Sequence, residues 1–120
     1  PCNTAHYWYD DLQKKITLPI INMPREVYKH TAKKCKKNSS IGLLATEGTL
    51  KTGVYNKFFD KNFNLIYPNT ITQINSVNKA IKLVKMRKVK TANKINHYFS
   101  CLSPIYLSVV FIYLCNIVRE

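Results

Sequence analysis

One stretch organises this sequence: residues 41–49, IGLLATEGT. It opens with a compact apolar run, Ile41 to Ala45, and continues into a turn built from glycine and threonine. An apolar strand, such a turn and then a helix form a frequent anion-binding arrangement, because the first N–H groups of a helix have no partner within the helix. Threonine hydroxyls would add donors at the same place. Many α/β proteins contain this pattern, so alone it indicates a fold rather than a function.

The segments after this turn continue an alternation of helix and strand. Leu50, Val54 and Phe58 are spaced by four residues and predict a helix. Phe63 to Tyr67 predicts the next strand, which Pro68 closes. A second, strongly periodic helix is predicted from four apolar residues: Ile74, Val77, Ile81 and Val84.

The segments before the turn show the same alternation. A helix is predicted over Ala5 to Ile16, and Leu18 to Met23 is predicted to be a short buried strand. Pro24 suits the first turn of another helix, whose core-facing side would include Cys35 and whose surface would include His30. The order helix, strand, helix, strand, helix, strand, helix predicts an α/β fold with a mostly parallel sheet.

Residues 1–8, PCNTAHYW, and residues 42–55, GLLATEGTLKTGVY, stand out together. In this order the two blocks resemble the aspartate/glutamate racemases, which are cofactor-independent amino-acid racemases. The similarity extends over residues 1–86 and implies a three-layer, parallel-sheet α/β domain, one of two lobes that enclose the site. It also implies a truncated form, with a site loop at 1–6, the start of the second lobe at 41–86 and a divergent apolar tail at 87–120.

The resemblance implies a reaction as well, a 1,1-proton transfer at the α-carbon of aspartate or glutamate. Two opposed cysteines would act, one as thiolate base and the other as thiol acid, without pyridoxal phosphate or metal. Cys2 matches the first cysteine, and Cys115 is predicted to be the second. The helix that follows Cys2 would stabilise a thiolate there. Four residues would hold the substrate's carboxylate and amino groups, although local capping would also suit them: Asn3, Thr4, Thr46 and Thr49.

The tail leaves three interpretations open, because residues 98–118 carry no charged side chain. One is a buried strand over Val109 to Leu114 that leads to Cys115. The second is a membrane span, and the third is out-of-frame or degenerate sequence. The β-branched and aromatic content favours the strand, and Pro104 weakens the span. Cys101 is a weaker candidate for the second thiol, because no strand precedes it.

Composition narrows the partners and the compartment. The net charge of +13 would suit nucleic acid, but sixteen of the nineteen basic residues are lysine, and arginine is the residue that reads bases bidentately. No nucleic-acid partner is therefore expected. The four cysteines form no CxxC pair, which predicts reduced thiols in a cytoplasmic protein rather than disulfides or a metal site.

The leading hypothesis is a racemase in truncated form, with a small acidic amino acid as ligand and little or no activity on its own. Two alternatives come from other classes: a non-catalytic basic binding protein that uses its lysine-rich helices, and a membrane-anchored fragment. Membrane contact is the less expected of the two. The face left by an absent lobe would favour self-association, so a homodimer is a further expectation.

Overall fold

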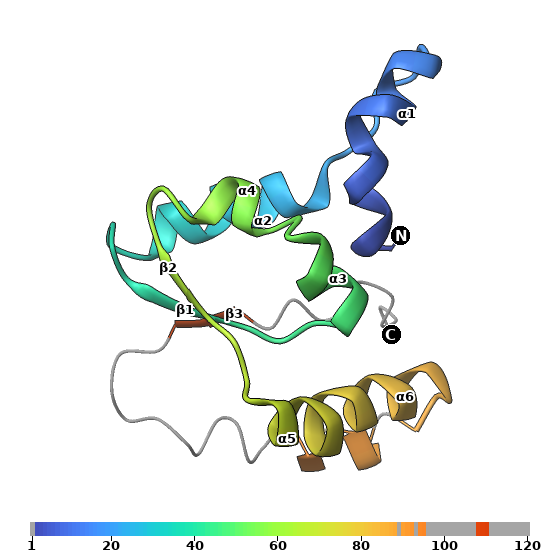
Figure 1. Ribbon diagram of the computed structural model, residues 1–120, viewed down its shortest axis with the longest axis vertical. Coiled ribbons are helices and arrows are strands. Elements are labelled where there is room, and N and C mark those ends of the chain that lie inside the picture. Colours follow the sequence, from blue (N-terminus) through green and yellow to red (C-terminus); the bar gives the residue numbers. More distant parts are fainter. Residues whose placement is uncertain (1, 89, 93, 96–107, 111–120) are drawn as a thin grey trace.

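A computed structural model describes residues 2–88, 90–92 and 94–95, and the backbone of residues 108–110. Helices and short parallel strands alternate along this part of the chain (Figure 1). In chain order the elements are η1, a 3-10 helix (Thr4–Trp8), α1 (Tyr9–Lys15), α2 (Met23–Lys34), β1 (Ser40–Leu43), α3 (Glu47–Thr52), α4 (Asn56–Phe59), β2 (Asn64–Ile66), α5 (Thr70–Thr72), η2, a π-helix (Gln73–Asn78), α6 (Lys79–Lys85) and β3 (Ser108–Val110).

The sheet has the strand order β2-β1-β3, and both neighbours run parallel to β1. Ile41 pairs with Leu65 on one side, and Gly42 pairs with Val109 on the other. Figure 1 shows α2 and α4 on one side of the sheet and α5 with α6 on the other. The predicted α/β fold with a parallel sheet is thus confirmed.

The core gathers at the central strand. Ile41 and Leu43 of β1 pack with Tyr55 and Phe59, and all four are almost fully buried. Phe63 joins the same cluster just before β2. Two predictions about single residues are confirmed as well. Cys35 packs against this cluster, and His30 is exposed.

The strand predicted over Leu18 to Met23 is wrong. Residues 18–22 are a loop in which Leu18 and Ile21 are 76% and 74% exposed, and Met23 already begins α2. Its backbone groups find side-chain partners from the preceding helix: Gln13 Oε1 accepts from the Ile20 N–H at 2.8 Å, and the Tyr9 hydroxyl donates to the Ile20 carbonyl at 3.2 Å. Hydrogen bonds with side chains of α1 take the place of the inter-strand hydrogen bonds that a strand would make.

The helix predicted through Leu50, Val54 and Phe58 is broken in two. Gly53 adopts a left-handed conformation with φ 61° and ends α3, and α4 begins at Asn56. Gly53 thus acts as the usual left-handed helix terminator. The three apolar residues still contact the core. Their spacing therefore predicted correctly that these side chains are buried or partly buried, but wrongly that one continuous helix carries them. The predicted helix through Ile74 and Val84 is confirmed as α5, η2 and α6 in succession.

The tail is described only at β3. Ser108–Val110 forms a strand beside β1, which agrees with the interpretation of this region as strand. The remainder of the predicted strand, Cys101 and Cys115 lie outside the described residues. Within the described part of the chain, no helix has the length and apolarity needed to cross a bilayer.

Candidate functional site

Cys2 lies at the start of the η1 turn, and its side chain is exposed. Its carbonyl accepts two hydrogen bonds, from the Ala5 N–H at 3.2 Å and from His6 Nδ1 at 2.9 Å. The backbone that carries the thiol is therefore held by groups three and four positions further along the chain. Cys2 also lines a small cavity of about 110 Å³ with Ala5, His6, Tyr9, Leu12 and Ile20.

Asn3 anchors this loop to the core. Its side chain is only 6% exposed, and its Oδ1 accepts a hydrogen bond of 2.8 Å from the hydroxyl of Tyr55. Tyr55 is itself 1% exposed and belongs to the central cluster. Asn3 was predicted to hold the substrate, whereas Tyr55 was quoted only as the end of the second motif block, and their bond spans 52 positions of the chain.

Three threonine hydroxyls form a chain beside this anchor. Thr49 Oγ1 lies 3.0 Å from Thr4 Oγ1 and 3.0 Å from Thr46 Oγ1. The Thr46 hydroxyl also caps α3 by accepting from the Thr49 N–H at 3.4 Å. A Cβ built on Gly48 would lie 3.4 Å from Thr4 Cγ2, which shows how closely the turn approaches the cysteine loop. Three of the four predicted ligand residues therefore meet in one place.

The three threonine hydroxyls have one more donor than the hydrogen bonds between them use. Three hydroxyls carry three protons, and the two oxygen–oxygen bonds use two of them. Among the described residues that hydrogen-bond to these threonines, none accepts the third proton. That hydroxyl can therefore donate to an oxygen atom of a ligand. A carboxylate is the kind of group that such a donor binds, because its two oxygens only accept.

A second network lies behind the turn. Gln73 Nε2 donates to the Ala45 carbonyl at 2.9 Å and to Asn78 Oδ1 at 2.8 Å, and Asn78 Nδ2 donates to Glu47 at 2.9 Å. The carbonyl and the carboxylate can only accept, so they fix both amides in this orientation. Gln73 Oε1 is buried without a hydrogen-bond partner in the described structure. Helical spacing predicted the apolar neighbours of Gln73 but gave no signal for this polar role.

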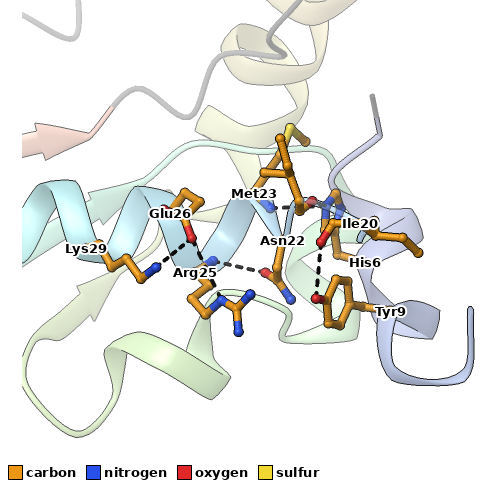
Figure 2. Close-up of polar contacts among 9 residues, drawn as sticks. His6, Tyr9, Ile20, Asn22, Met23, Arg25, Glu26 and Lys29 are labelled. Carbon is orange, nitrogen blue, oxygen red and sulfur yellow. Dashed lines mark hydrogen bonds and ion pairs between the residues drawn. The ribbon is translucent and has the colours of Figure 1, made fainter. Parts of the chain in front are cut away.

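His6 belongs to the first motif block, residues 1–8, and no role was predicted for it. Figure 2 shows it beside Tyr9, Ile20 and Met23, between the cysteine loop and the start of α2. Its Nε2 lies 3.2 Å from the Met23 N–H nitrogen and 3.3 Å from the Ile21 carbonyl oxygen. Among the described residues, no group of three His, Cys, Asp or Glu side chains is placed to hold a metal ion.

These features define a class of protein: a small parallel α/β structure with an exposed thiol on a loop that a threonine contact joins to a capped turn. The Asp/Glu/hydantoin racemase family matches residues 1–97, so this chain belongs to that family. The broad specificity amino-acid racemase RacX of Bacillus subtilis (strain 168) is 34% identical over 65 residues. The aligned part is 52% of this chain and 26% of RacX, so the chain spans about a quarter of that relative's length.

Proposed function

We propose that this chain carries one half of a cofactor-independent racemase site for an acidic amino acid, aspartate or glutamate. The observation that supports it is the contact between Thr4, two positions after Cys2, and Thr49, 45 positions further along the chain. It joins the thiol loop to the threonine turn, the two places where the chain resembles the family. The described α/β region would then be part of one three-layer lobe.

In this proposal Cys2 is one acid/base group and Cys115 the opposed one. Removing the α-proton from one face and returning it to the other needs a group on each side of the carbon. The negative charge that develops beside the carboxylate needs hydrogen-bond donors. Thr4, Thr46 and Thr49 would supply donors to the carboxylate, and Asn3 would position the loop through Tyr55.

We propose further that the chain alone racemises little. The chain spans about a quarter of RacX, and a site that has only part of its walls leaves a carbanion exposed to water even when both thiols are present. With each enantiomer of aspartate and glutamate, chiral chromatography is expected to show no inversion above the rate in buffer. Inversion that disappears in Cys2→Ala, but not in Cys35→Ala, would mean that the chain forms a complete site.

Binding can be tested separately from turnover. Titration with aspartate should shift the backbone amide resonances of Thr4, Thr46 and Thr49 and saturate in the millimolar range, as a weak single-site interaction does. Thr49→Val, which removes the central hydroxyl, should weaken this binding by about tenfold or more. Thr52→Val is the matched control, because that hydroxyl bonds the Gly48 and Thr49 carbonyls within its own helix.

A general attraction of anions to a chain with net charge +13 must be separated from a site. Sodium chloride added at the same ionic strength should leave the three threonine amides unmoved, because chloride is an anion without a carboxylate. If aspartate shifts only lysine-rich surfaces, or titrates Thr49→Val like the unchanged chain, the proposed carboxylate site is wrong.

A further inference from the structure

The imidazole of His6 joins two segments that are distant in the sequence. Nδ1 lies 2.9 Å from the Cys2 carbonyl oxygen, and Nε2 lies 3.2 Å from the backbone nitrogen of Met23 (Figure 2). The first partner lies four positions before His6 and the second lies 17 positions after it. One ring therefore bridges the thiol loop and the first residue of α2.

The partners determine where the ring proton is. A carbonyl oxygen only accepts, so the bond to Cys2 requires the proton on Nδ1. A backbone N–H only donates, so the bond from Met23 requires a bare Nε2. The neutral ring with its proton on Nδ1 satisfies both contacts. A doubly protonated ring would face the Met23 N–H with a second N–H and would keep only the Ile21 carbonyl, 3.3 Å away, as a partner on that side.

Both ends of the bridge meet a structural need. Met23 is the first residue of α2, and its N–H is one of the four at a helix start that lack a partner within the helix. Asn22 Oδ1 accepts from the Arg25 N–H at 3.0 Å, and His6 Nε2 serves the Met23 N–H beside it. At the other end, the Cys2 carbonyl gains a second donor in addition to the Ala5 N–H.

We propose that His6 is a positioning residue that fixes the Cys2 loop against the N-terminus of α2 through its neutral, Nδ1-protonated ring. This inference rests on the proposed function for the importance of Cys2, but the bridge itself is a property of the folded chain. A thiol that exchanges a proton with an α-carbon reacts faster when its backbone is held in one geometry, because small misplacements slow the reaction strongly.

The first test reads the proton. In the uniformly ¹⁵N-labelled chain at pH 8, the two ring nitrogens of His6 should give a protonated signal for Nδ1 and a non-protonated signal for Nε2. His30 is exposed and provides the reference for an unconstrained ring. A proton on Nε2 of His6 would overturn the inference, and this measurement needs no variant and no substrate.

Variants then separate the two halves of the bridge. His6→Ala should lower the ¹⁵N order parameter at Cys2 and Asn3 from about 0.85 to below about 0.6. It should also speed amide exchange at Met23 by about five- to tenfold, as loss of a hydrogen bond predicts. His6→Asn, whose amide nitrogen takes the place of Nδ1, should restore order at Cys2 alone. His6→Gln, whose oxygen takes the place of Nε2, should restore protection at Met23 alone.

His30→Ala is the matched control and should change neither quantity. Order parameters at Cys2 that stay in the rigid range in His6→Ala would overturn the positioning role. Absence of aspartate binding would instead count against the proposed function and would leave these measurements, which use the ligand-free chain, unaffected.

Discussion

Single buried polar residues connect the thiol loop to the body of the protein. The side chain of Asn3 reaches the Tyr55 hydroxyl inside the core, and Thr4 reaches Thr49 at the turn. The first contact gives the buried side-chain oxygen of Asn3 a donor, and a buried polar group left without one costs about 1–3 kcal/mol. These residues therefore stabilise the fold and shape the proposed site at once.

Tyr55→Phe should destabilise the chain by about 1–3 kcal/mol in urea unfolding, because it leaves the buried oxygen of Asn3 without its donor. Tyr67→Phe is the control. The Tyr67 hydroxyl accepts from Asn56 at 2.6 Å on an exposed surface, and its loss should change the free energy of unfolding by less than about 0.5 kcal/mol. Equal effects of the two substitutions would show that the Asn3 contact contributes no more than a surface bond.

At the scale of elements, Gly53 divides one predicted helix into α3 and α4. Its left-handed conformation interrupts the helix between them, and the Gly53 N–H donates to the Leu50 carbonyl at 3.2 Å at the end of α3. This break sets α3 beside η1, so that its first turn reaches Thr4, while α4 packs near α2. If α3 and α4 formed one continuous helix, the residues that contact η1 and those that contact α2 would lie along a single axis.

Gly53→Ala should lower the free energy of unfolding by about 1–2 kcal/mol, because an L side chain is strained at positive φ. Gly48→Ala provides the comparison within the same helix. Its Cβ would make ordinary contacts with Thr4, and alanine favours a helix over glycine, so stability should stay level or rise by up to about 1 kcal/mol. A Gly53→Ala chain as stable as the original would contradict the role given to this residue.

At the scale of the whole molecule, η1 and α1 form an arm that extends away from the sheet, next to α3 (Figure 1). The arm has few buried apolar residues, and Leu12, Ile16 and Trp8 are all exposed on it. An ion pair of 2.8 Å between Asp10 of the arm and Lys57 of α4 adds a polar attachment. The hydrogen bond from Lys57, followed by its charge, holds the pKa of Asp10 below its ordinary value of 3.8.

A carboxyl group whose pKa is lowered by folding stabilises the folded state above its unfolded pKa. That contribution is lost as the pH falls through the folded pKa. At low salt, the fluorescence anisotropy of Trp8, the one tryptophan of the chain, should therefore fall as the pH drops below about 4. Asp10→Asn should show the lower anisotropy already at neutral pH and little further change.

Glu26→Gln is the control for this experiment. Its partner Lys29 lies within the same helix at 2.8 Å, so its loss should leave the arm in place. About 0.5 M salt should reduce the difference between Asp10→Asn and the unchanged chain, because both groups are exposed and screened. Anisotropy that is the same for Asp10→Asn and the unchanged chain at every pH would show that the ion pair does not attach the arm.

The sequence by itself determined which segments alternate and which are apolar enough to be buried. Residues 41–49 predicted the strand and a helix after it, because the spacing of apolar residues acts over a few positions. Capping was an alternative role for Thr46, and the structure shows that cap. The resemblance of residues 1–8 and 42–55 predicted the family to which the chain belongs.

Only the tertiary structure decided which of these residues meet. Leu18 to Met23 has the composition of a strand but lies where side chains of α1 satisfy its backbone, so no strand forms. The hydrogen bond between Thr4 and Thr49 and the bridge made by His6 depend on where distant segments come together. Such contacts follow from closure of the whole chain, which local spacing does not specify.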